Sequence, residues 1–198
     1  MAKKAYVYNG NAWEDLASSI SDLSSYATTV DLDDYQLKSA SGLTLINTTT
    51  FSAVASQSIN NVFSATYDNY KIILQTTANA TTSMRIKLRV AGVDSSASYG
   101  TGVWLVDGSG ILNLSANNVT TGFYIQPSIA DYNLASIDIS LPFLVDRTRL
   151  VGTSTHLYYG DRRMLSLGGV HDVALSYTGF TIISTSLTGT VSVYGYQK

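Results

Sequence analysis

The chain has 198 residues, with a formal net charge of −2 at neutral pH and a pI of about 5.5. It is 45% hydrophobic but only 13% charged, and it lacks the basic excess of a nucleic-acid-binding domain. It contains no cysteine, which excludes disulfides, thiolate metal sites and cysteine nucleophiles.

The chain opens on a short alternating stretch, Lys4 to Tyr8, followed by the tight-turn signal Tyr8-Asn9-Gly10. This pattern predicts a small hairpin spanning residues 4–13. No apolar run like the core of a signal peptide follows the two N-terminal lysines. No window approaches the roughly 18 apolar residues that a membrane helix requires. We therefore expect a protein made in the cytoplasm, with no membrane insertion.

From Trp13 onward the apolar residues recur at alternating spacings of three and four, the seam of a coiled coil. The seam residues are Trp13, Leu16, Ile20, Leu23, Ala27 and Val30. A helix with so narrow an apolar stripe is marginal alone in water. The pattern predicts that copies from several subunits pack this seam together, and the alternative is a helix lying on its own domain.

Beyond a short link at residues 31–41, the apolar period changes to two. The stretch MRIKLRV, residues 84–90, alternates apolar and basic residues throughout, as a strand buried on one face does. Similar strands recur about every ten residues with turn signals between them. The sequence thus predicts a mainly β protein, an antiparallel jelly-roll-like β-sandwich at residues 42–198, preceded at residues 1–41 by a short hairpin and a self-associating coiled-coil helix.

The chain offers little catalytic chemistry. Its only histidines are His156 and His171, and together with Asp161 they match no recognised metal motif. Most acidic residues are aspartates in turns, so no facing carboxylate pair can be selected. We predict no enzymatic activity, no cofactor and no bound metal.

Tyrosine is the one aromatic excess, with 14 Tyr against 5 Phe and 2 Trp. Tyr combines an apolar face with a polar hydroxyl and suits sugar-binding and protein-binding surfaces. Clustered arginines could hold anionic groups. The candidate ligand-binding residues are Tyr99, Trp104, Tyr158, Tyr159, Arg162 and Arg163. The alternative for each tyrosine is an ordinary position in a strand or a subunit interface.

The segment AYVYNGNAWEDLASSISDLSSYATTVDLDDY, residues 5–35, resembles the N-terminal segments of structural proteins from tailed bacteriophages. The stretch at residues 51–74, together with MRIKLRVAG and the closing GTVSVYGYQK, is similar to the β-rich domain of phage fibre or appendage proteins. The resemblance implies a homotrimeric short tail fibre or head fibre. It implies location in the virion after assembly in the host cytoplasm, attachment to other virion proteins through the N-terminal segment, and presentation of the β-domain to the host surface, with a glycan as candidate ligand.

Two other hypotheses remain open from the sequence. Within the same class, the protein could decorate and stabilise a capsid. In another class, it could be a carbohydrate-binding module or a polysaccharide-degrading enzyme. No nucleic-acid partner is expected for any of these.

Overall fold

The computed structural model of the protein describes residues 6–8, 10–15, 42–78, 82–108, 110–119, 121–129, 132–158 and 161–198. The chain divides into two compact units, Met1–Ser41 and Gly42–Lys198. The first contains a two-stranded sheet and the second an eleven-stranded sheet. Across these described ranges, no helix is long and apolar enough to span a membrane.

The described part of the N-terminal unit is a hairpin of two short strands, β1 (Tyr6–Tyr8) and β2 (Trp13–Asp15). Tyr8 pairs with Trp13 across the hairpin, and their ring centroids lie 5.3 Å apart. Gly10 in the turn has a φ of 98°, a left-handed conformation that favours glycine. The expected hairpin is present, and its second strand continues past Trp13.

The prediction of a coiled-coil helix that begins at Trp13 is wrong at this first residue. Trp13 lies in β2, where side chains alternate with a period of two, so it cannot open a helical seam. No residue that the structure describes is helical. The other residues assigned to the seam, Leu16, Ile20, Leu23, Ala27 and Val30, lie outside the described residues.

Two strands of the second unit are long, β3 (Leu43–Ile59) and β13 (Gly179–Tyr196). The shorter strands, in chain order, are β4 (Asn69–Ala78), β5 (Thr82–Val90), β6 (Val93–Asp94), β7 (Tyr99–Asp107), β8 (Gly110–Val119), β9 (Phe123–Ile129), β10 (Tyr132–Ser140), β11 (Thr148–Tyr158) and β12 (Asp161–His171).

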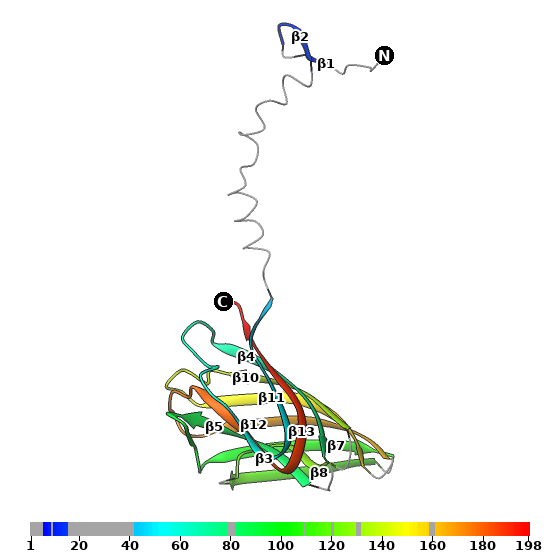
Figure 1. Ribbon diagram of the computed structural model, residues 1–198, viewed down its shortest axis with the longest axis vertical. Helices are drawn as coiled ribbons and strands as arrows, with labels where there is room; N and C mark the ends of the chain where they lie inside the picture. Colours follow the sequence, from blue (N-terminus) through cyan, green and yellow to red (C-terminus); the bar gives the residue numbers. More distant parts are fainter. Residues whose placement is uncertain are drawn as a thin grey trace. The chain divides into compact units, whose positions relative to one another are not determined.

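These strands form one antiparallel sheet that branches at β13. One side of β13 pairs with β3 along most of its length. The other side pairs with β5 over residues 179–183 and with β4 over residues 187–195. From β4 the sheet continues through β10, β11, β12 and β7 to β8, and it curls into an open half-barrel (Figure 1).

The prediction of a jelly-roll-like β-sandwich is therefore wrong. A sandwich needs two separate sheets. Here the long strand β13 pairs with β5 near its start and with β4 further along, so the strands on both sides belong to one sheet. The β5–β9 pair covers the inner face of the curled sheet, because β9 pairs with β5 and also contacts β7, β10, β11 and β12.

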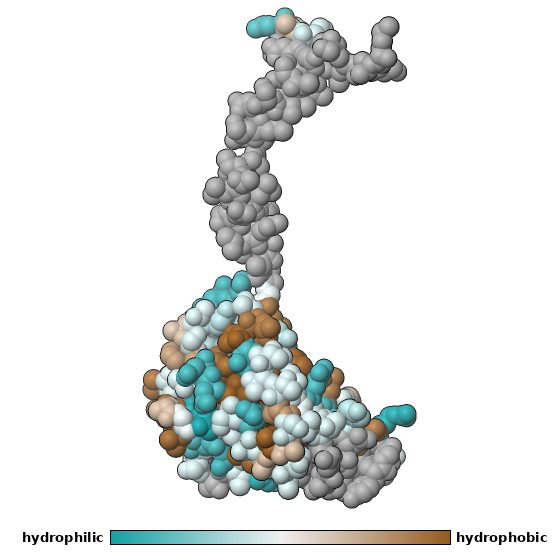
Figure 2. All heavy atoms as spheres, viewed as in Figure 1, coloured by the Kyte–Doolittle hydropathy of each residue, from teal (hydrophilic) through white to brown (hydrophobic). Residues whose placement is uncertain are grey.

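The core lies on the inner face of the curled sheet, and the strands alternate as the sequence predicts. In β5, Met84, Ile86 and Leu88 are fully buried, while the basic residues between them are only partly buried. Apolar side chains are not confined to the core. Figure 2 shows apolar patches beside hydrophilic ones on the visible face of the domain.

Candidate functional site

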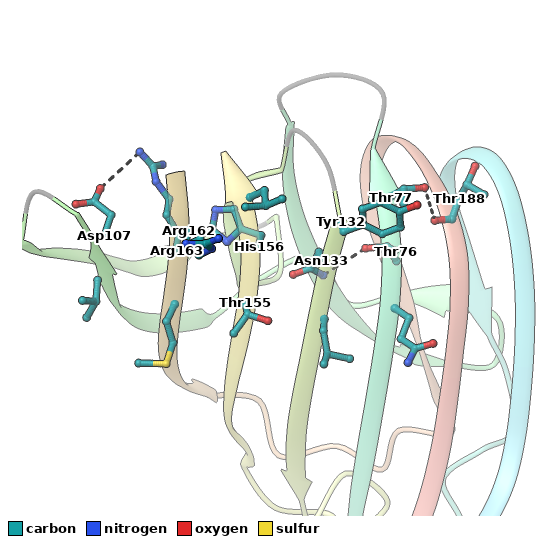
Figure 3. A pocket seen from close by; sticks show the side chains of 15 residues that line it. Thr76, Thr77, Asp107, Tyr132, Asn133, Thr155, His156, Arg162, Arg163 and Thr188 are labelled. Atoms are coloured by element: carbon teal, nitrogen blue, oxygen red, sulfur yellow. Dashed lines mark hydrogen bonds and ion pairs between the residues drawn. The ribbon is translucent and has the colours of Figure 1, made fainter. Parts of the chain in front are cut away.

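An open cavity of about 830 Å³ lies at one end of the half-barrel, where β4, β10, β11, β12 and β7 begin or end. This volume is within the usual range for small-molecule sites, about 300–1,000 Å³. The lining residues are Gln75, Thr76, Thr77, Val106, Asp107, Tyr132, Asn133, Leu134, Thr155, His156, Leu157, Arg162, Arg163, Met164 and Thr188 (Figure 3).

Five polar side chains from five neighbouring strands form what we call the floor of the cavity: Thr76, Asn133, His156, Arg163 and Asp107. Register places them in one row, because Asn133 pairs with both Thr76 and His156, and His156 pairs with Arg163. Each continues the inward-facing positions of its strand, so the floor closes one end of the apolar core. Asn133 and His156 are only 4% and 5% exposed.

Interactions along the floor link neighbouring strands. The Asn133 side-chain amide donates to Thr76 Oγ1 at 3.3 Å. The Arg163 guanidinium lies 3.6 Å from the Asp107 carboxylate, as the dashed line in Figure 3 marks. His156 lies between these two pairs, and neither of its ring nitrogens has a hydrogen-bond partner among the described parts of the chain.

The pKa of His156 is lowered to about 4, first by burial and second by the positive charge of Arg163. The imidazole is therefore neutral at physiological pH, with one nitrogen as donor and the other as acceptor. Because Arg163 and Asp107 compensate each other, the floor as a whole carries no net charge.

Outward-facing residues of the same strands form the rim of the cavity: Tyr132, Leu134, Met164 and Val106 are all exposed, Tyr132 by 70%. Register makes Met164 the neighbour of Val106, and Leu134 and Met164 both flank Thr155. Floor and rim residues alternate along the same strands, so the row of exposed apolar side chains lies on the outer face of the sheet and the polar floor on its inner face.

The structure brings two of the candidate ligand-binding residues into the cavity. Arg162 is exposed at its rim, and Arg163 lies in its floor. Trp104, 63% exposed, points to the outer face of β7 two residues before Val106, outside the cavity lining. Tyr158 ends β11 and its side chain is not described; Tyr159 lies outside the described residues.

Tyr99 is placed in the core instead of on a binding surface. It is fully buried, its hydroxyl accepts from the Leu88 amide at 2.9 Å, and it donates to the Ser95 carbonyl at 3.3 Å. Its ring stacks on His171, with centroids 4.2 Å apart. Burial raises the pKa of Tyr99, so the hydroxyl stays protonated and serves as a fixed structural hydrogen bond.

The two histidines lie at opposite ends of the β11–β12 pair. His156 pairs with Arg163 and His171 with Thr148, eight residues further along β12, or roughly 26 Å at about 3.3 Å per residue. They cannot share a metal ion. Among the residues that the structure describes, no three His, Asp or Glu side chains gather as a metal site.

The cavity is equipped for binding more than for covalent chemistry. Among its described lining residues the one carboxylate is Asp107, which pairs with Arg163, whereas glycoside hydrolysis uses two facing carboxyl groups. Ser154 is the nearest hydroxyl to His156 on the inward face of β11, yet neither side chain has a hydrogen-bond partner among the residues that the structure describes, so no serine–histidine pair forms.

Thr76, Asn133 and His156 were not among the predicted ligand-binding residues, although the sequence carries a signal for them. Each is a polar residue on the inward, mostly apolar positions of its strand, as Asn133 is before Ala135 and Ile137. A scan against models of known protein families finds no match for this chain, and a search of curated protein sequences finds none either.

Proposed function

We propose that this protein is a non-enzymatic virion protein of a tailed bacteriophage. In this proposal it is an appendage subunit that attaches to other virion proteins by its N-terminal segment and binds a host-surface glycan with its sheet domain. The observation that carries the binding role is the open cavity at the strand ends, which is lined by the exposed side chains of Tyr132, Leu134, Met164 and Val106. Aromatic and apolar surface beside planar polar groups is suited to sugar rings.

The N-terminal hairpin supports the attachment role. Tyr8 and Trp13 are exposed by 52% and 71% and pack against each other on this small sheet. An isolated two-stranded hairpin is marginally stable in water, and exposed aromatics are typical anchors at protein interfaces. Docking of this aromatic pair on a virion protein would stabilise the hairpin and bury both rings. The resemblance to phage N-terminal segments lies in the same stretch.

Particles that lack this protein are expected to adsorb to host cells about tenfold more slowly, equivalent to about 1.4 kcal/mol in the activation free energy of adsorption. The measurement is the adsorption rate constant of otherwise identical particles with and without the protein. Normal adsorption combined with reduced resistance of the particles to heat would favour the capsid-decorating alternative. A chain that begins at Gly42 provides the control for attachment, because it should fold yet be missing from purified particles.

The proposal includes a homotrimer, and two sheet edges support self-association. Among the described strands β3 pairs only with β13, and β8 only with β7, so each has one open side. Neither strand contains a charged residue or a proline, the features that usually protect edges from pairing. Pairing of β3 in one copy with β8 in the next is a head-to-tail contact, which closes into a ring when its rotation is suitable.

Leu45→Lys is expected to convert a three-chain assembly into single chains. Leu45 lies on β3 and is exposed by 55%, so the new charge opposes strand pairing while affecting the stability of the subunit little. Size-exclusion chromatography with light scattering measures the mass. The matched control is Leu175→Lys, at an exposed leucine outside the strands, which should keep the native mass. A single-chain mass for the unaltered protein would contradict the trimer.

A further inference from the structure

One cation on the rim of the cavity has no acidic partner among the residues that the structure describes. Arg162 is exposed, and none of the ion pairs between described side chains includes it. In the floor, Arg163 faces Asp107 and His156 is neutral, so these three groups together contribute no net charge. The lining of the cavity therefore carries one positive charge, and it lies at Arg162.

Register places Arg162 in line with Tyr132, the most exposed side chain of the rim. Arg162 pairs with Leu157 of β11. Extended by one residue, the register of β10 with β11 puts Tyr132 on the other side of Leu157. The floor residues occupy the alternate, inward positions, so these three side chains share the outer face of the sheet. Tyr132 and Arg162 thus lie on the two strands that flank β11 (Figure 3), with backbones about 10 Å apart at about 4.8 Å per strand.

The next row of the same outer face is apolar apart from one hydroxyl. Leu134 and Met164 are 48% and 56% exposed, and Thr155 lies between them. Leu134 is two residues from Tyr132 on β10, so both side chains point to the same side of the sheet. A single ring on the outer face can therefore contact Tyr132 and Leu134 while one of its substituents extends toward Arg162.

The charge of Arg162 defines the chemistry of that substituent. A guanidinium is planar and presents its donors in a fork that matches both oxygens of a carboxylate. Such a charge-assisted pair is roughly twice as strong as a hydrogen bond between neutral groups. One carboxylate also balances the single positive charge of the lining, whereas an uncharged sugar leaves it unbalanced.

We propose that the rim of the cavity binds a pyranose sugar that carries a carboxylate, with the carboxylate on the Arg162 guanidinium and the apolar face of the ring against Tyr132 and Leu134. This inference deepens the proposed glycan binding and rests on it. It names the residues and the sugar class, which the proposed function leaves open. All three residues line the cavity and are exposed.

The test compares each acidic sugar with its own methyl ester, which has the same ring but no charge. The probes are the methyl glycosides of glucuronic acid, galacturonic acid and N-acetylneuraminic acid, each titrated with the full chain at neutral pH and low salt. Saturation-transfer NMR of the sugar signals measures the Kd. At least one acid should bind about tenfold more tightly than its ester, as expected for a charge-assisted pair.

Two substitutions separate the charge from the ring contact. Arg162→Gln should raise the Kd of the acid to that of its ester and leave the ester unchanged. Tyr132→Ala should weaken the acid and the ester by the same factor, because contact with the ring does not depend on charge. The matched control is Arg149→Gln, at an exposed arginine on the outer face of β11 but outside the cavity lining, which should retain the preference for the acid.

The following results would overturn the inference. Equal affinities of acid and ester for all three sugars, or no binding of any probe, would exclude a carboxylate on Arg162. A preference that survives Arg162→Gln, or that Arg149→Gln removes to the same extent, would report the overall field of the protein in place of this pair. Unchanged affinities in Tyr132→Ala would place the ring elsewhere.

The failure of this inference can be told apart from the failure of the proposed function. If particles lacking the protein adsorb slowly while no acidic sugar binds through Arg162, the adhesion role stands and this inference fails. If an acidic sugar binds through Arg162 while adsorption does not depend on the protein, the sugar site stands and the adhesion role fails.

Discussion

Gly189→Ala is expected to lower the free energy of unfolding of the sheet domain by about 3 kcal/mol, toward the upper end of the range for overpacking substitutions. A Cβ at Gly189 would lie 2.1 Å from the backbone oxygen of Gln75 and 2.8 Å from Thr76 Cα. Backbone atoms of a paired strand cannot rotate away as a flexible side chain does. The β13–β4 ladder must therefore separate next to the bulge that lies between Leu187 and Gly189.

The matched control is Gly102→Ala. Gly102 also lies within a strand, β7, but no atom comes within 4 Å of its added Cβ, so stability should change by less than about 0.5 kcal/mol. Urea unfolding followed by circular dichroism measures both variants. Equal stabilities for the two would show that the β13–β4 contact at Gly189 is not as close as the structure has it. Because Thr76 is part of the floor, Gly189→Ala should also weaken any ligand binding there.

The same region explains why the sequence predicted a sandwich. Alternation correctly indicates which face of a strand is buried, as Met84, Ile86 and Leu88 show. It does not indicate where a strand ends. The stretch STSLTGT, residues 184–190, has the composition of a turn, although it lies within one strand of 18 residues. The ladder with β3, interrupted by bulges, carries the strand through this stretch, and the two expected sheets become one.

The candidate site could be predicted only in part, for a related reason. Composition pointed to tyrosines and arginines as ligand-binding residues. This criterion found Arg162 and Arg163, which line the cavity, but it also selected Tyr99, which is buried in the core. The floor is assembled by register, and register depends on long-range pairing that one strand does not reveal. Asn133 and His156 each continue an inward-facing set of positions in the sequence, but their alignment on neighbouring strands required the structure.

Acidification from about pH 7 to about pH 4 is expected to remove about 3 kcal/mol of folding stability through His156 alone. The folded protein holds the pKa of this group near 4, below its ordinary value of 6.5, chiefly through burial. Between these two values the unfolded chain binds the proton and the folded protein does not, so acid favours unfolding. The folding stability that depends on a neutral His156 is fully present above pH 6.5, declines as the pH falls, and is lost below about pH 4.

His156→Asn separates this effect from the other titrating groups. The carboxylates and His171, whose pKa burial also lowers, titrate alike in both proteins, so the difference between the two stability profiles isolates His156. Urea unfolding measured at several values between about pH 7 and about pH 4 should give a flatter profile for the variant, by about 3 kcal/mol over the range. Parallel profiles would mean that the floor hydrates His156 enough to let it protonate in the folded state.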